Sequence, residues 1–158
     1  MANNPVLRVF SIVAMLAVIL AGAATAVAAG DLPGVTMSPE EILAAQAKEP
    51  PLERKDIDDY IALLPSILAM QGVTEAEFDA GAFQGAIEAQ GVTPIRFGVL
   101  MSKVSLATMR MLGIDLGPQL EAFPEALRPS EAEVKLVEDN WDRIQKAYTD
   151  FQSAQAAD

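Results

Sequence analysis

The chain has 158 residues, no Cys, no His, and a formal net charge of −11 from 11 basic and 22 acidic residues. The length fits a single domain. The two missing residue types exclude disulfides, Cys/His metal sites and nucleophilic sites that use a histidine base. The negative charge makes nucleic acid an unfavourable partner.

Residues 1–28 have the pattern of a secretory signal peptide. Arg8 precedes an uncharged apolar run that becomes rich in Ala and ends with the small residues of Ala26-Val27-Ala28. This order predicts cleavage after Ala28 and places the remaining chain outside the cytoplasm, in the periplasm or secreted. The alternative is an uncleaved anchor over residues 9–29, a run long enough to span a bilayer.

Residues 29–37 form a Gly/Pro linker, and the first helix of the remaining chain is predicted over 38–48. Ser38, Pro39 and Glu41 give it an N-terminal capping box with proline at the first helical position. The next helix is expected to begin near Asp56. One face of that helix carries its apolar residues, with spacings of three and four: Ile57, Tyr60, Ile61, Leu64 and Leu68. Pro65 predicts a kink or a break within it.

Two further helices are predicted over 75–90 and 94–112. Each follows a Gly-Val-Thr tripeptide, in which Gly ends one helix and Thr caps the next. The short connection at 91–93 predicts that the two helices lie antiparallel. Gly81 and Gly85 share one face of the first helix, which favours close approach of a neighbour. Helix 94–112 is apolar almost all round, so we expect it to be central and buried.

Three basic residues lie seven apart on helix 94–112: Arg96, Lys103 and Arg110. They fall within about 40° of one another and form a narrow stripe. The functional interpretation is a partner-binding stripe for an acidic helix or an anionic headgroup. Two structural interpretations stand beside it. The stripe is a solvent-facing edge with its stems over apolar neighbours, or it pairs with an acidic helix of the same chain, such as 131–150.

A short helix interrupted by Pro124 is predicted over 118–127, and a last helix starts with the capping box of Ser130 and Glu133. Its apolar residues repeat every three or four positions: Val134, Val137, Trp141, Ile144, Tyr148 and Phe151. Residues 153–158 are expected to fray. No segment alternates with a period of two. The sequence therefore predicts an all-α fold, a compact bundle of four or five helices over residues 38–152.

Two clusters of residues carry atoms that could bind a metal ion. Asp56, Asp58 and Asp59 could offer oxygen ligands to Ca²⁺, but the EF-hand spacing is absent, and an acidic first turn also suits the helix dipole. Met101, Met109 and Met111 do not converge on one face, as a Cu(I) site would require. We therefore expect no cofactor, no metal ion and no enzymatic activity.

These features predict an exported, non-catalytic helical protein with an interaction or chaperone-like role. The layout resembles that of small exported helical proteins of the Spy/CpxP chaperone type, although their L-T-x-x-Q motif does not occur here. Such a module would expose an apolar groove or patch to a protein partner, and a homodimer is compatible with it. The alternatives are a carrier of a small apolar ligand or lipid within the bundle, lined by Gly81 and Gly85, and a membrane-tethered domain that keeps residues 9–29.

Overall fold

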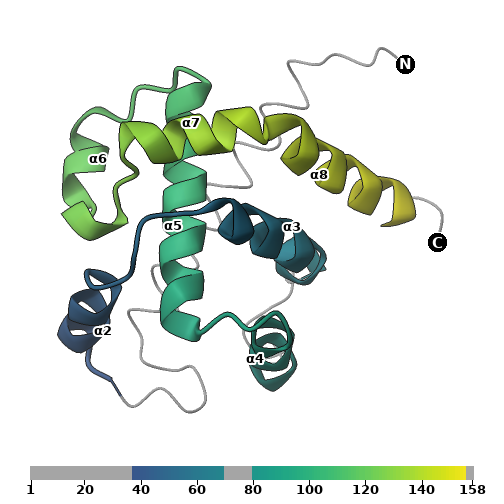
Figure 1. Ribbon diagram of the computed structural model, residues 1–158, viewed down its shortest axis with the longest axis horizontal. Coiled ribbons are helices and arrows are strands. Elements are labelled where there is room, and N and C mark those ends of the chain that lie inside the picture. Colours follow the sequence, from purple (N-terminus) through teal and green to yellow (C-terminus); the bar gives the residue numbers. More distant parts are fainter. Residues whose placement is uncertain (1–36, 70–79, 156–158) are drawn as a thin grey trace.

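The computed structural model describes residues 37–69 and 80–155, and within these ranges the chain is helical and has no strand (Figure 1). The fold class predicted from the sequence is therefore confirmed for this part of the chain. The helices outnumber the four or five expected: α2 (Pro39–Gln46), α3 (Arg54–Ala69), α4 (Ala80–Ala89), α5 (Pro94–Met111), α6 (Gly117–Ala122), η1 (Glu125–Leu127, a 3-10 turn), α7 (Glu131–Asp139) and α8 (Trp141–Gln155). The signal-peptide prediction and linker residues 29–36 lie outside the described residues.

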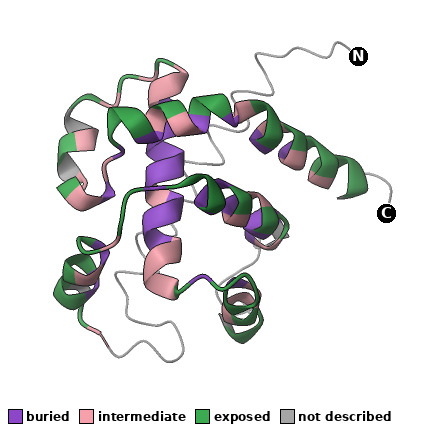
Figure 2. Cartoon of the chain, viewed as in Figure 1, coloured by how far each residue is buried: buried purple, intermediate pink, exposed green. Residues whose placement is uncertain are grey.

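Helix α5 is the centre of the molecule. Almost every residue from Gly98 to Met109 is buried, and Figure 2 shows this burial along most of the helix. The expectation that this apolar helix is central is therefore confirmed. It packs mainly against α7 and α2 and also contacts α3, α4 and η1.

Local sequence signals set the helix starts where they were predicted. Ser38 and Ser130 form complete capping boxes with Glu41 and Glu133, and the hydroxyl of Thr93 accepts a hydrogen bond from the N–H of Arg96. Gly91 ends α4 with a φ of 71°, the left-handed conformation that glycine adopts without steric cost. The sites of these turns follow from side chains close in sequence, which is why the pattern predicted them.

Two features of the middle of the chain differ from what the sequence predicted. Pro65 was expected to kink or break its helix, and the break does not occur, because α3 continues through Pro65 to Ala69. Figure 1 shows α4 nearly end-on where α5 runs lengthwise, so the two helices cross instead of lying antiparallel. The part of the predicted helix at 75–79, with its cap at Thr74, lies outside the described residues.

Close helix approach occurs at a different glycine from the two expected. Gly81 and Gly85 are exposed on α4, and a Cβ at Gly85 would meet nothing within 4 Å. Gly98 of α5 instead faces α2, where a Cβ would lie 2.7 Å from Nε2 of the buried Gln46. The small residue that allows two helices to approach is therefore in the central helix.

The predicted last helix is divided in two. Helix α7 ends at Asp139, α8 begins at Trp141, and Asn140 alone separates them. Helix α7 packs on α5, whereas α8 packs on α3 and extends to Gln155, so residues 153–155 of the segment expected to fray are helical. Figure 1 shows α8 as an arm at the edge of the molecule.

One main hydrophobic cluster joins the helices. Its buried members from α3, α5 and the last two helices include Ile57, Tyr60, Leu64, Leu100, Val104, Val137, Ile144 and Tyr148. Phe83 of α4 meets Phe97 of α5 edge to face, with ring centroids 5.3 Å apart. Among the described residues no helix combines the length and apolar character needed to cross a bilayer.

Candidate functional site

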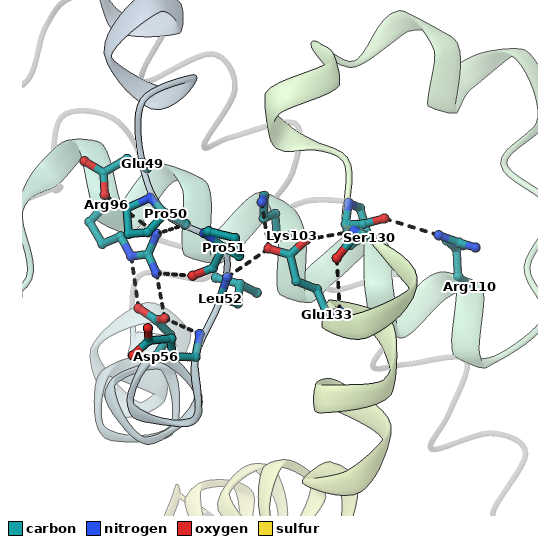
Figure 3. A network of polar contacts seen from close by, with 12 residues as sticks. Glu49, Pro50, Pro51, Leu52, Asp56, Arg96, Lys103, Arg110, Ser130 and Glu133 are labelled. Atoms are coloured by element: carbon teal, nitrogen blue, oxygen red, sulfur yellow. Dashed lines mark hydrogen bonds and ion pairs between the residues drawn. The ribbon is translucent and has the colours of Figure 1, made fainter.

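The basic stripe of α5 is engaged along its whole length with acidic residues of the same chain (Figure 3). Seven residues make almost two full turns, so the three cations share one face as predicted. Each meets a carboxylate from another element: Arg96 meets Asp56 of α3, and Lys103 and Arg110 meet Glu133 and Glu131 of α7. The stripe is a seam that joins α5 to two other helices.

Arg96 holds the start of α3 and the segment before it. Its guanidinium donates two hydrogen bonds to the Asp56 carboxylate, at 3.0 and 2.6 Å. It also donates to the carbonyls of Pro50 and Pro51, at 2.6 and 3.2 Å. Residues 50–53, the last part of the connection between α2 and α3, are thereby fastened across α5, and we call them the strap. A planar fork with five donors suits this combination of acceptors, whereas an ammonium group does not.

Lys103 and Glu133 form the buried centre of the seam. The Lys103 ammonium lies 2.7 Å from the Glu133 carboxylate, and the side chains are 10% and 3% exposed. The same carboxylate accepts the N–H of Leu52 in the strap at 2.9 Å and the N–H of Ser130 at 2.7 Å. A buried charge is tolerated when it is paired and fully hydrogen-bonded, and Glu133 meets both conditions.

The environment of Glu133 strongly favours its charged form. Burial alone would raise the pKa of this carboxyl group. The hydrogen bonds from Lys103, Ser130 and Leu52 together outweigh burial and lower the pKa from 4.5 to about 2. Glu133 is therefore ionised at neutral pH and acts as an acceptor that ties α7 and the strap to α5.

Arg110 is the exposed end of the seam. It donates to the carbonyl of Pro129 at 3.2 Å and pairs with Glu131, whose side chain is 85% exposed. Exposed ion pairs contribute little to stability because water competes for both charges. In the structure the stripe pairs with acidic residues of the same chain, which is one of the two structural interpretations given above. Binding of an outside partner by Arg96, Lys103 and Arg110 stays a prediction, and it requires these pairs to open.

The acidic cluster at the start of α3 is spread among three cations. Asp56 pairs with Arg96, Asp58 with Arg143 of α8, and Asp59 with Lys55. No group of three metal-ligating residues is gathered in the described ranges. The methionines are dispersed too, because Met101 belongs to the main hydrophobic cluster and Met109 to a second one beside Trp141.

Two features could not be predicted from the sequence: the contact of two tyrosines between α3 and α8, and the helix break at Asn140. Tyr60 and Tyr148 are neighbours in the core, and the Tyr148 hydroxyl is buried. Burial first, and the neighbouring Tyr148 second, raise the pKa of Tyr60 well above 10.0. Asn140 interrupts the last helix. Both tyrosines lie on predicted apolar faces, so the pattern located them in the core but could not show that they meet.

Comparison with known proteins adds no family to these observations. No protein-family model, curated protein or solved structure matches this chain.

Proposed function

We propose that this chain is an exported, non-catalytic helical protein that binds an amphipathic helix of a partner protein, in an interaction or chaperone-like role. The observation that carries the proposal is the attachment of α8. This helix lies at the edge of the molecule, packs on α3 through one apolar stripe, and is joined to the body by Asn140 alone. An apolar helix face that already packs against one amphipathic helix has the chemistry to pack against another.

A binding surface of this kind has to be uncovered before it can act. Leu43 is the one exposed large hydrophobic residue in the described part of the chain. An interaction module needs a contiguous apolar surface, and the α3 face beneath α8 is such a surface. Ile144 and Tyr148 of α8 are buried in the main hydrophobic cluster, to which α3 contributes, and Phe151 is partly buried against that cluster.

The polar contacts that hold α8 to α3 are weaker than those that hold α7 to α5. The pair between Arg143 and Asp58 has side chains that are 46% and 51% exposed, so it contributes at most about 1 kcal/mol. Helix α7, in contrast, is fastened by the buried pair of Lys103 and Glu133. Weaker polar contacts therefore oppose movement of α8 than oppose movement of α7.

A synthetic peptide of residues 141–155 tests this proposal. Ile144→Ala in the full chain reduces the free energy that holds α8 on α3 by about 2–5 kcal/mol but leaves the α3 face intact. The labelled native peptide should then bind the variant at least about tenfold more tightly than it binds the unaltered protein. Thr149→Ala, on the exposed side of α8, is the matched control and should leave peptide affinity unchanged.

The peptide itself needs a control. A peptide carrying Ile144→Asp and Tyr148→Asp should not bind, because it lacks the apolar stripe. Circular dichroism of the Ile144→Ala variant checks that the remaining helices are folded. If the folded variant binds the native peptide no better than the unaltered protein does, the α3 face is not a helix-binding surface.

Export is the second part of the proposal and depends on residues 1–28. Expression of the full chain with its own N-terminal segment, followed by mass spectrometry of soluble and membrane fractions, tests it. A soluble product that begins at Ala29 supports a cleaved signal peptide. The full-length chain in the membrane fraction would replace this proposal with the tethered domain.

A further inference from the structure

The break between α7 and α8 is made by side chains, since residues 131–155 contain neither Gly nor Pro. The N–H of Asn140 bonds to the carbonyl of Val137 at 3.1 Å, one residue short of an α-helical bond. Its side-chain amide takes the freed helical position and donates to the carbonyl of Leu136 at 2.8 Å. The backbone of Asn140 lies outside the helical region, with φ −112° and ψ 9°. A rotation of about 50° in each angle at this one residue would make the helix continuous.

Arg143 connects this break to α3. Its guanidinium donates to the Asn140 side-chain oxygen at 3.0 Å and to Asp58 at 2.6 Å. The bonds of Asn140 to Leu136 and Arg143 lie within the α7–α8 segment, so of these contacts only the pair with Asp58 requires α8 to lie on α3. The Asn140 side chain therefore holds the bend locally, and the hinge is this one residue.

The apolar spacing runs through the break without a change of phase. Val134, Val137 and Trp141 are followed by Ile144, Tyr148 and Phe151 at steps of three and four. This spacing keeps one stripe on a continuous helix. A continuous helix would lift the C-terminal part of α8 away from α3, leaving Ile144 and Tyr148 exposed together with the α3 face.

We propose that α7 and α8 can join into one helix and that α8 then docks on α3 of a second copy of this chain. The α8 of the second copy docks on α3 of the first, so that the two copies exchange this helix. This proposal rests on the proposed function, because it requires the α3 face to accept a helix from outside its chain. A second copy is the occupant that fits best. Its α8 is identical, so the contacts between Tyr60 and Tyr148 and between Asp58 and Arg143 reform across the dimer.

The exchange also has the symmetry of a closed dimer. Each copy gives one α8 and receives one, so both apolar faces are covered and no further copy can be added. The net charge of −11 on each chain opposes association, most strongly at low salt. Association is therefore measured at physiological ionic strength.

Two substitutions at one position test the hinge. Asn140→Ala and Asn140→Gly both remove the side-chain bonds to Leu136 and Arg143, but only alanine favours a continuous helix. Since a dimer contains two hinges, the dimer association constant of Asn140→Ala should exceed that of Asn140→Gly by about tenfold to thirtyfold. Sedimentation over a wide concentration range measures both constants. Equal constants, or two variants that remain monomeric, would overturn the proposal.

Energy transfer identifies which surface the dimer uses. The chain has no native Cys, so single dyes can be placed at the exposed Ala62→Cys of α3 and Gln152→Cys of α8. Mixed dimers of singly labelled Asn140→Ala chains should reach the transfer of one chain labelled at both sites. A dimer with clearly lower transfer uses another surface, and the exchange is then wrong.

The peptide experiment separates this proposal from the one on which it rests. If the peptide binds the Ile144→Ala variant but α8 is not exchanged, the helix-binding function stands and the second copy is not its occupant. If neither binding nor exchange occurs, both proposals fail.

Discussion

Replacing Glu133 by alanine removes the acceptor at the centre of the seam. The substitution leaves the Lys103 ammonium buried without a carboxylate and removes the acceptor of the Leu52 N–H in the strap. Removing one partner of a buried ion pair costs about 3–5 kcal/mol, because the remaining charge is uncompensated. We expect a loss of this size in the free energy of unfolding, a large share of the 5–15 kcal/mol typical of a whole domain.

The pH dependence gives a second route to the same magnitude. The folded chain lowers the pKa of Glu133 from 4.5 to about 2, a difference that corresponds to about 3 kcal/mol. Because the folded pKa is the lower one, this stability is fully present above pH 4.5. It is lost as the pH falls from about 4.5 towards 2. The Glu133→Ala variant should lack this part of the acid dependence.

Urea unfolding, followed by the fluorescence of the single tryptophan, Trp141, and by circular dichroism, measures these quantities. Glu131→Ala is the matched control, because it removes the exposed partner of Arg110 and should cost less than about 1 kcal/mol. The double variant Lys103→Met/Glu133→Leu should lose less than Glu133→Ala, since it leaves no unpaired charge. If Glu133→Ala lowers the free energy of unfolding no more than Glu131→Ala does, or if it keeps the full acid dependence, this prediction is wrong. The ion pair of Lys103 and Glu133 would then not hold α7 and the strap to α5.

Three further predictions concern other contacts. Gly85→Ala should raise the free energy of unfolding by about 0.5–1 kcal/mol, because a Cβ there meets nothing within 4 Å; an unchanged melting temperature would contradict this. Arg96→Lys should cost about 1–2 kcal/mol in urea unfolding, since lysine cannot hold Asp56 and the strap carbonyls together; equal stability would show that the fork is unnecessary. Stability should fall as the pH rises above about 10, because the raised pKa of Tyr60 makes the unfolded chain release its proton first. Tyr60→Phe should weaken this alkaline loss in the urea midpoint, and an identical pH profile would refute the assignment.

The parts of the fold that were predicted correctly depend on residues close in sequence. Ser38 and Ser130 bond to backbone groups three residues away, so a capping box states where a helix begins whatever surrounds it. The same holds for Gly91, whose φ is set by the turn it makes. Pro65 shows the limit of such reasoning. Proline removes one bond of the α3 backbone, but packing of Leu63, Leu64 and Ile67 in the core keeps the helix continuous.

For a similar reason, the sequence predicted the shared face of the three basic residues but not all of their partners. The spacing of Arg96, Lys103 and Arg110 fixes their shared face because helix geometry is local. Their partners come from other elements, and the strap carbonyls that Arg96 binds carry no sequence signal. Asp56 was identified within an acidic first turn, yet its pairing with Arg96 depends on how α3 crosses α5. The acidic helix 131–150 was the partner suggested for the stripe, and it supplies two of the three carboxylates.

Asn140 explains why the last helix could not be predicted as two. Its neighbours have the charge pairs and apolar spacing of a continuous helix, and asparagine is only moderately unfavourable within one. The Asn140 side chain forms the bend through bonds to Leu136 and Arg143, and Arg143 also reaches Asp58, which is far away in sequence. An asparagine amide turns to its own backbone only in some surroundings, whereas a capping box marks a helix start by itself. That difference is the physical reason why the proposed joint is placed at Asn140 and not at the start of α7.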